Sequence, residues 1–275
     1  MLASCRRDDM QPASKPKLLA QAVYQLSNER FDTTKSQIVH QFWYGSNARL
    51  TRMRRRFYEG VLIDIHNEFV YDGVGNIVTQ ITHSLSGETD SSFYIYSLGL
   101  PFFAYSRTQN ASYVYDNSGR LIERNDTLWS LRVAPYINDI VPQKTIYNYT
   151  DSGVIETLFM QTRSGMVETA KTYIKFHAMV NNPFEHLQTR VDHLYSGILY
   201  PSYNYLHYAK QGMVSEMKTI LPNGKVNSIC KFDVLKKMPG NNYPQIVRIT
   251  ILGYRDIGPN DTVIYHHHFQ YKEIY

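Results

Sequence analysis

Hydrophobic and polar residues alternate along most of the chain. Val247, Ile249 and Ile251 are separated by polar neighbours, and the segment 263–271 keeps the same period of two. Residues two apart point to the same face of a β-strand, so this pattern predicts strands with one buried and one solvated face. The pattern therefore predicts a predominantly β fold.

A short motif recurs where these predicted strands end. The sequence FVYDGVGNIV at 69–78 matches YVYDNSGRLI at 113–122 and YNYTDSGVI at 147–155, and weaker copies lie at 42–50 and 208–214. The common form is aromatic-x-Tyr-Asp-x-x-Gly-x-aliphatic. In the two weakest copies Ala48 and Ala209 depart from this form, so those turns are less well defined.

The chemistry of the motif is that of a β-hairpin turn. The aspartate accepts hydrogen bonds from the turn backbone, the glycine adopts positive φ, and the aliphatic residue opens the return strand opposite the tyrosine. We interpret the motif as a structural element and not as a catalytic one. The turn residues of the three clear copies are Tyr71, Asp72 and Gly75, then Tyr115, Asp116 and Gly119, then Tyr149, Asp151 and Gly153.

Repetition of short turns sets the topology. Strands of about 10 residues joined by such turns fit about 14 to 18 times into the chain, and short turns make sequential strands antiparallel. We predict an all-β fold, a large up-and-down meander that closes into a barrel or a strongly curled sheet. It would form one domain over 17–275, after a flexible tail at 1–16.

Two segments have helical spacing. Asn182 and Pro183 suit the start of a helix, and the hydrophobic positions that begin at Phe184 predict a short helix at about 183–196 that packs at a rim or plugs an opening. The second segment runs from Leu18 to Leu26, where we expect the first strand instead because of the family resemblance described below.

The composition agrees with a folded β protein. The 275 residues include 23 Tyr and 12 Phe, and charged residues make up 19%. So much aromatic surface excludes a disordered chain, and no apolar stretch approaches the roughly 18 residues of a membrane-spanning helix.

Most of the positive charge is local. The formal net charge is +5, and five arginines lie within residues 49–56. In a strand Arg52, Arg54 and Arg56 share one face, which we interpret as a solvated basic face; a patch for lipid headgroups or acidic glycans is the alternative. The opposite face carries Met53, Arg55 and Phe57. No nucleic-acid-binding signature accompanies this charge, so we expect no nucleic-acid partner.

The two cysteines have different surroundings. Cys230 lies in a predicted strand where hydrophobic and polar residues alternate, and we expect it to be a small buried residue. Cys5 follows Leu2-Ala3-Ser4 and precedes a polar tail, which resembles the end of a bacterial lipobox, although only four residues precede it. We expect Cys5 to be lipidated in the native protein, which would anchor an exported chain to a membrane.

Together these features resemble known bacterial sequences. The Tyr-Asp-x-x-Gly pattern resembles the YD repeats of large bacterial surface and toxin-shell proteins. The lipobox-like start, the hairpin motifs and the central segment 181–184 resemble secreted lipoproteins of the Bacteroidetes, a family of unknown function with a porin-like fold. The resemblance covers roughly 17–275 and implies a large antiparallel barrel, with no activity and no catalytic residues to transfer.

Few residues suggest chemistry. His266, His267 and His268 alternate in direction along a strand, so at most two of them could start a metal site, and a solvated or lumen-facing strand is the simpler interpretation. Three glutamates, Glu123, Glu156 and Glu168, lie at equivalent hairpin positions, as expected of repeats. No hydrolase, phosphate-binding, dinucleotide or metalloprotease motif occurs, so we predict no catalytic, cofactor-binding or metal residues.

Three functions are consistent with these observations. The first is a non-enzymatic, monomeric outer-membrane lipoprotein, periplasmic or surface-exposed, whose barrel binds a glycan or peptide or serves a structural role; Tyr-rich faces suit both kinds of ligand. The second is an integral outer-membrane barrel, since strands of this length and a terminal aromatic residue, Tyr275, are typical of that class. The third is an envelope glycan hydrolase, which would need two carboxylates about 5 to 10 Å apart.

Overall fold

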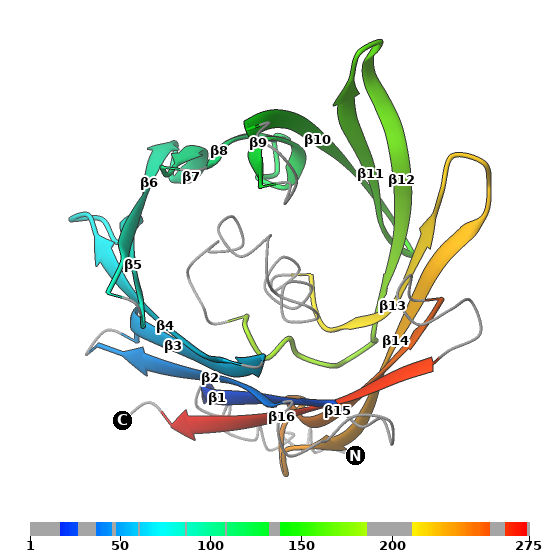
Figure 1. Ribbon diagram of the computed structural model, residues 1–275. Coiled ribbons are helices and arrows are strands. Elements are labelled where there is room, and N and C mark those ends of the chain that lie inside the picture. Colours follow the sequence, from blue (N-terminus) through cyan, green and yellow to red (C-terminus); the bar gives the residue numbers. More distant parts are fainter. Residues whose placement is uncertain are drawn as a thin grey trace, which may run out of the picture.

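The chain forms a closed antiparallel barrel (Figure 1). The computed structural model describes residues 17–26, 37–45, 48–59, 61–85, 87–107, 109–131, 138–185, 211–253 and 262–273. Within this part each strand pairs with its neighbours in chain order, and β1 pairs with β16 to close the sheet. The strands are β1 (Lys17–Leu26), β2 (Gln37–Tyr44), β3 (Leu50–Glu59), β4 (Val61–Tyr71), β5 (Ile77–Ser84), β6 (Thr89–Ser97), β7 (Leu100–Tyr105), β8 (Gln109–Tyr115), β9 (Leu121–Leu131), β10 (Asn138–Thr150), β11 (Gly153–Thr162), β12 (Gly165–Phe176), β13 (Val214–Ile220), β14 (Val226–Lys237), β15 (Pro244–Leu252) and β16 (Thr262–Glu273).

The predicted fold class is confirmed. The strands follow one another up and down, their number lies within the predicted range, and the segment from Leu18 to Leu26 belongs to the first strand. Pro183 to Glu185 form a turn, while 186–196, where the rest of the predicted helix would lie, fall outside the described residues. No helix long and apolar enough to span a membrane occurs in the described part of the chain.

The alternation of the sequence separates a lumenal from an outer face. Val247 and Ile249 are completely buried and Ile251 nearly so. Register pairs Val247 with Val234 and His267, which places these side chains on one face of the sheet. The segment 177–185 runs inside the ring of strands (Figure 1), where Phe184 contacts residues of this same face. The buried face therefore lines the lumen.

The motif turns all lie at one rim. They connect β4 to β5, β8 to β9 and β10 to β11, and each repeat spans two strands, so every copy returns to the same end of the barrel. In the first turn Asp72 Oδ1 accepts hydrogen bonds from the backbone N–H groups of Val74, Gly75 and Asn76 at 3.0, 2.7 and 2.8 Å. Gly75 has a φ of 99°, which favours glycine.

The other two turns vary this scheme. Asp116 Oδ1 accepts from the N–H groups of Ser118 and Arg120, both at 2.9 Å, and these bonds lower the pKa of Asp116. In the third turn the Thr150 hydroxyl donates to the carbonyl of Gly153 at 3.2 Å, while Asp151 is exposed. The aspartate thus organises two turns and a threonine bridges the third.

Tyrosines at the ends of four strands have a role that the hairpin interpretation does not include. Three of them belong to motif copies, and Tyr271 of β16 lies outside the motif. The hydroxyl donates to the backbone carbonyl near the start of the preceding strand, which ties the two strands together at the rim. The four such bonds join Tyr44 to Leu19 at 2.8 Å, Tyr71 to Leu50 at 2.6 Å, Tyr149 to Leu121 at 3.0 Å and Tyr271 to Pro244 at 2.7 Å. Burial raises the pKa of Tyr71 to about 12, so its hydroxyl keeps the proton that it donates.

Basic side chains of the turns link one repeat to the next. The guanidinium of Arg49, in the turn before β3, lies 5.5 Å from the ring centroid of Tyr71, and that of Arg120, before β9, lies 4.9 Å from the ring of Tyr149. Each contact is a cation–π interaction between consecutive hairpins. The rim is therefore a chain of coupled turns.

Removal of one rim hydroxyl tests this role. Tyr71→Phe should lower the free energy of unfolding by about 1 kcal/mol, because the buried bond to Leu50 is lost while the ring stays. The measurement is urea denaturation followed by circular dichroism. Tyr173→Phe is the matched control, since Tyr173 is exposed on the outer face and should be neutral. Equal stability of the two variants would contradict the proposed role.

Candidate functional site

The lumen has an apolar side, filled by the chain itself. Phe184 is completely buried and makes edge-to-face contacts with Phe42 of β2 and Phe269 of β16, with ring centroids 5.9 and 6.3 Å away. These two rings in turn contact His40 and His267, each at 6.3 Å. The five rings form a cluster, the Phe184 cluster, that holds the inner segment against the wall.

Both histidines of the Phe184 cluster are neutral at ordinary pH. Burial, and then the charge of Arg55 on the neighbouring strand, lower the pKa of His40 to about 3. Burial and the nearby His268, His40 and His266 lower the pKa of His267 well below its usual value. Two uncharged imidazoles suit an aromatic cluster, since a buried charge would be costly there.

Polar bonds fix both ends of the inner segment. His177 Nε2 lies 2.6 Å from the carbonyl of Phe232 in β14, and the Asn182 amide donates to the carbonyl of Gly212 at 3.0 Å. The Tyr243 hydroxyl bonds to the Glu185 carboxylate, and burial together with this bond raises the pKa of Tyr243. The segment is thus an integral part of the described core.

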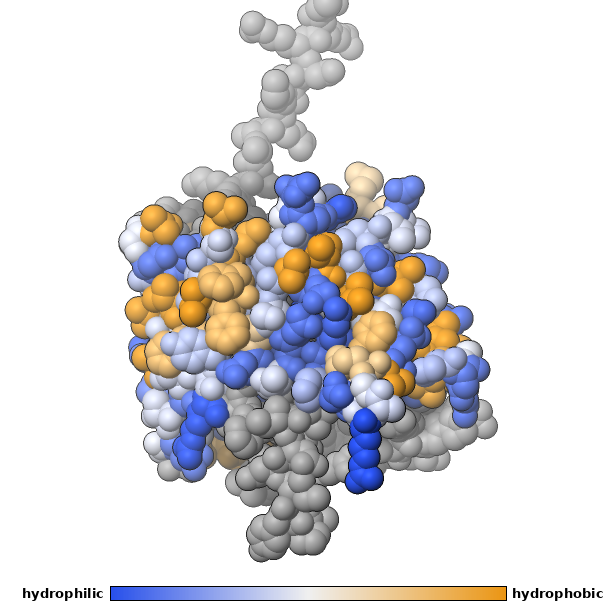
Figure 2. Space-filling model, turned by 90° about the horizontal axis from the view of Figure 1, so that it is seen from above, coloured by the Kyte–Doolittle hydropathy of each residue, from blue (hydrophilic) through white to orange (hydrophobic). Residues whose placement is uncertain are grey.

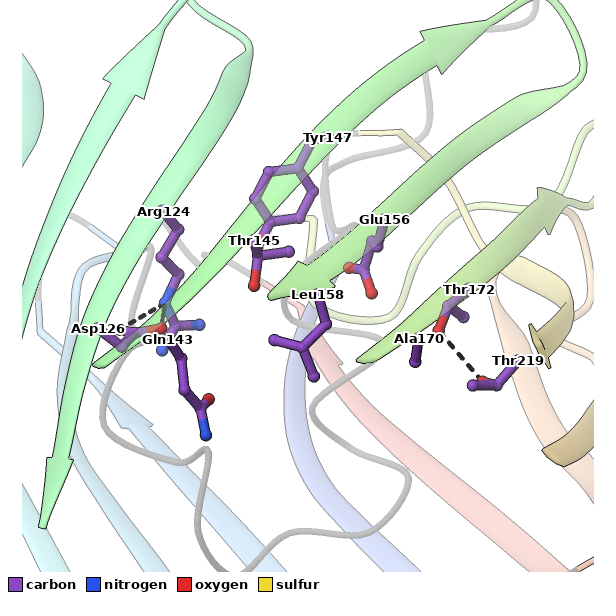
Figure 3. Close-up of a pocket in the computed structure, with 10 residues that line it drawn as sticks. All are labelled: Arg124, Asp126, Gln143, Thr145, Tyr147, Glu156, Leu158, Ala170, Thr172 and Thr219. Carbon is purple, nitrogen blue, oxygen red and sulfur yellow. Dashed lines mark hydrogen bonds and ion pairs between the residues drawn. The ribbon is translucent and has the colours of Figure 1, made fainter. Parts of the chain in front are cut away.

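The opposite side of the lumen is polar and contains a cavity of about 420 Å³. This volume lies within the range of sites that bind small molecules. Strands β9 to β13 supply the wall, and their lumenal side chains converge on one space (Figure 3). The lining residues are Arg124, Asp126, Gln143, Thr145, Tyr147, Glu156, Leu158, Ala170, Thr172 and Thr219.

A buried ion pair forms one end of the cavity. Arg124 and Asp126 are two apart on β9 and therefore point to the same face. Arg124 Nε donates to Asp126 Oδ1 at 2.9 Å and lies 2.8 Å from Oδ2, and the two residues are only 3% and 7% exposed. Breaking a buried pair by removing one partner is costly, so both side chains are held in fixed positions.

The rest of the wall offers hydroxyl, amide and apolar groups. Thr172 and Thr219, on paired strands, share a hydrogen bond of 3.1 Å between their hydroxyls. The buried ring of Tyr147, next to Thr145, and the side chain of Leu158 add apolar surface to the wall (Figure 3). The cavity combines donors, acceptors and one aromatic ring.

The two acidic residues of the cavity start from distant positions on the sheet. Asp126 pairs with Gln143 and Glu156 pairs with Tyr147, so the two residues are separated by two strand spacings and four positions along β10. Standard sheet dimensions place their Cα atoms about 16 Å apart. Asp126 is moreover bound to Arg124. Among the described residues no group of three or more His, Cys, Asp or Glu side chains could hold a metal ion.

The residues singled out in the sequence lie at other places. The motif turn residues occupy the rim, and Cys5 lies outside the described residues. His266 and His268 pair with Arg248 and Ile246 on the outer face, whereas His267 faces the lumen. Cys230 is half-buried on β14, and burial raises its pKa to about 11.

The three glutamates that we took as equivalent in the repeats are not equivalent, because Glu123 lies four residues after Gly119 whereas Glu156 lies three after Gly153. Glu156 lines the cavity, while Glu123 and Glu168 form ion pairs with Lys144 and Lys171 at 2.6 and 3.2 Å. The lysine and a bond from Asn125 lower the pKa of Glu123. The sequence analysis did not identify Arg124, Asp126 and Gln143. The register of the whole sheet decides which face of each strand points into the lumen, and the sequence does not reveal it. The polar residues on alternate positions of 124–126 and 143–147 are the only sequence signal for this site.

The arginine-rich strand β3 has the two faces that the alternation predicts. Arg54 and Asp64 form a bidentate pair at 2.9 and 2.6 Å on the outer face, and Arg52 lies 3.9 Å from Glu68. Arg54 lowers the pKa of Asp64. Arg55 is buried on the lumenal face. The outer arginines are thus largely matched by the acidic side chains of β4.

Comparisons with known proteins show a shared fold. No protein-family model matches the chain, and no curated protein does. A porin-like protein from Bacteroides uniformis is similar in structure, with a TM-score of 0.56 and 11% identity over 94% of this chain and 99% of that one. A porin-like protein from Bacteroides vulgatus has a TM-score of 0.26 at 12% identity over 94% and 99%, and the TcdB2-TccC3-Cdc42 complex has 0.29 at 9% over 79% and 13%. Only the first similarity is strong enough to support a barrel fold in common.

Proposed function

We propose that the chain is a non-enzymatic, monomeric β-barrel binding module of the bacterial cell envelope, with its ligand site in the polar lumenal cavity. The observation that carries the proposal is the divided lumen. One side is filled by the Phe184 cluster, and the other keeps a cavity lined by fixed polar side chains. A purely structural barrel has no need to bury an ion pair beside an empty space, since apolar packing would stabilise it as well.

The envelope location rests on sequence and fold together. The residues before and after Cys5 resemble a lipobox, and a porin-like protein from Bacteroides uniformis has a similar barrel fold. We propose a lipid anchor at Cys5 that holds the barrel at the outer membrane. The barrel itself would stay in the aqueous phase.

Charges on the outer face support an aqueous barrel. A membrane barrel presents an apolar band to lipid all round, and charges on that band are destabilising. Figure 2 shows hydrophobic and hydrophilic side chains intermixed on one side of the outer wall. Ion pairs occur on several sectors of the outer face, namely Arg54–Asp64, Lys144–Glu123, Lys175–Glu216 and Arg248–Asp233.

One observation favours the alternative of an integral outer-membrane barrel. The outer face of β6 to β8 exposes Phe93, Ile95 and Tyr105, and the only charged residue of these strands, Asp90, pairs with Thr82 on the lumenal side. Such a sector resembles a lipid-facing surface. It covers three of the described strands, whereas an integral barrel needs an apolar band on all of them.

A solubility and conductance experiment separates the two proposals. The full chain with Cys5→Ser, which cannot be lipidated, should purify without detergent as a monomer, and it should give no channel conductance in planar bilayers. Analytical ultracentrifugation and single-channel recording measure these properties. A protein that needs detergent and conducts ions would establish the integral barrel instead. The cavity does not favour a hydrolase, because one of its two carboxylates, Asp126, is held in an ion pair with Arg124.

A further inference from the structure

We infer that the barrel touches a lipid bilayer directly, through an apolar corner between β4 and β7 at the rim of the motif turns. The side chains of this corner enter the headgroup layer while the barrel stays in water. The inference adds to the proposed function, on which it rests, the face by which the tethered barrel meets the membrane. The apolar corner consists of two turn residues, Val74 and Leu98, and of four residues exposed on the wall below them, Phe93, Ile95, Phe102 and Tyr105.

Leu98 occupies a position that suits a leucine neither in backbone nor in exposure. It lies in the two-residue turn between β6 and β7, where Leu98 and Gly99 both have positive φ, 52° and 74°. Turns of this kind favour Asn-Gly, because a left-handed backbone is strained for a bulky side chain. The Leu98 side chain is moreover 99% exposed. Strain together with exposure points to a function for this leucine and not to the stability of the hairpin.

A second exposed tip lies on the same rim. Val74, in the turn between β4 and β5, is 82% exposed. In the described part of the chain Leu98 and Val74 are the two most exposed large hydrophobic residues. Their turns belong to consecutive hairpins, since β5 pairs with β6, so both tips project from the barrel in the same direction. One apolar surface could therefore receive both side chains.

The outer wall below Leu98 continues the apolar surface. Residues 91–106, which span most of β6, the turn and β7, contain no charged residue. Phe93 and Tyr105 are exposed on this wall, and their rings stack across the two strands with centroids 5.1 Å apart. Within the mixed surface of Figure 2, hydrophobic side chains are densest toward the left, the side of β6 and β7. The corner thus joins two projecting tips to an uncharged wall.

A second copy of the chain or a sugar fits this corner poorly. The corner is convex, because it passes from the outside of a closed barrel over the rim onto two tips. A symmetric dimer would press this surface against itself, and two convex surfaces meet over less than the about 800 Å² that each partner of a specific interface buries. A sugar covers a free aromatic face, whereas Phe93 and Tyr105 turn their faces toward each other at 25°.

A bilayer fits both the shape and the chemistry of the corner. Lipids are fluid and close around projecting side chains, and the interfacial layer accepts apolar and aromatic groups that carry no charge. The tether also joins the barrel at this rim, because the Tyr44 hydroxyl at the end of β2 bonds to Leu19 at the start of β1. Cys5 precedes Lys17 by 12 positions, which span at most about 40 Å. An anchor at Cys5 and the apolar corner would therefore hold the same rim toward the membrane.

Vesicle flotation of the full chain with Cys5→Ser tests the inference without the lipid anchor. The probes are vesicles of phosphatidylcholine and vesicles that also contain phosphatidylglycerol, and the protein should bind to both. Leu98→Asn should lower the vesicle partition coefficient about tenfold, because a fully exposed leucine no longer leaves water. The factor should be the same for both vesicles, since the substitution changes no charge. Asparagine suits this turn, so the variant should unfold at the same or a higher urea concentration.

Two further variants separate the corner from general hydrophobicity. Val74→Ser tests the second tip without altering the turn at Leu98, and it should lower the partition coefficient about three- to tenfold. Leu85→Asn is the matched control, because Leu85 is 64% exposed in the turn between β5 and β6 at the opposite rim. It should leave the partition coefficient unchanged.

The outcomes distinguish this inference from the proposed function. A detergent-free, non-conducting monomer that binds neither kind of vesicle would keep the binding module and refute the membrane contact. Binding that Leu98→Asn and Val74→Ser leave unchanged, or that Leu85→Asn lowers equally, would refute it as well. A concentration-dependent dimer that Leu98→Asn dissociates would assign the corner to a second copy instead. Conductance in bilayers would refute the proposed function itself.

Discussion

Gly153→Ala should lower the free energy of unfolding by about 3 kcal/mol or more, the largest single effect that we expect in this chain. A Cβ atom at Gly153 would overlap the backbone carbonyl oxygen of Ile174 on the adjacent strand β12. The obstacle is backbone within a paired ladder, so it cannot rotate away as a side chain would. The φ of Gly153, 153°, adds strain for any residue with a side chain.

The other end of the same strand provides the control. Gly165 forms the turn between β11 and β12 with a φ of 110°, and a Cβ atom there would meet nothing within 4 Å. Gly165→Ala should therefore cost only the backbone strain, about 1 kcal/mol. Urea denaturation of the two variants measures the difference. Equal losses would mean that the close approach to Ile174 relaxes at no cost.

The second large effect is a loss of stability in mild acid. Between pH 7.5 and pH 5 the contribution of His40 should fall by about 2 kcal/mol. In the unfolded chain His40 binds a proton near pH 6.5, whereas in the barrel its pKa is about 3. The unfolded state therefore binds more protons throughout this interval, so stability is present above pH 6.5 and is lost as the pH falls. His267 changes stability in the same direction, because its pKa is also lowered by burial.

Urea denaturation at several pH values tests this expectation. His40→Gln should remove the His40 share of the pH dependence, whatever its effect on stability at pH 7.5. The carboxylates with lowered pKa, such as Asp64 and Asp116, lose their contribution only at lower pH, near the ordinary pKa of an aspartate and below it. His83→Gln is the control, since His83 is on the partly exposed outer face. An unchanged slope in His40→Gln would contradict the assignment.

The fold could be predicted from the sequence because local signals agree with the global topology. Alternation at positions such as 247–251 sets the strands, and the repeated turn motif makes them sequential and antiparallel. The sequence does not distinguish a closed barrel from a curled sheet, because closure depends on the pairing of β1 with β16. That pairing joins the two ends of the barrel-forming sequence and leaves no local signal.

The candidate site could not be predicted, because it depends on which face is inside. A period of two gives two faces without saying which lines the lumen. Glu123 lies four residues after its turn glycine and Glu156 lies three, so the two point to opposite faces, but the sequence does not say which of them lines the cavity. The bonds of the rim tyrosines were likewise not predicted, since the carbonyl of Leu50 that accepts from Tyr71 lies 21 residues earlier in the chain.

The rim also suggests how a barrel of this kind can change in size. Each repeat is one hairpin, and Arg49 and Arg120 contact the tyrosine of the next hairpin along the chain. Duplication or loss of a whole repeat would therefore keep every such contact in register. It would alter the circumference by complete hairpins, so the strand number would stay even and both ends of the sheet would remain at the same rim. Gene duplication could therefore adjust the width of the lumen in steps of one hairpin, while the contacts between neighbouring turns stay the same.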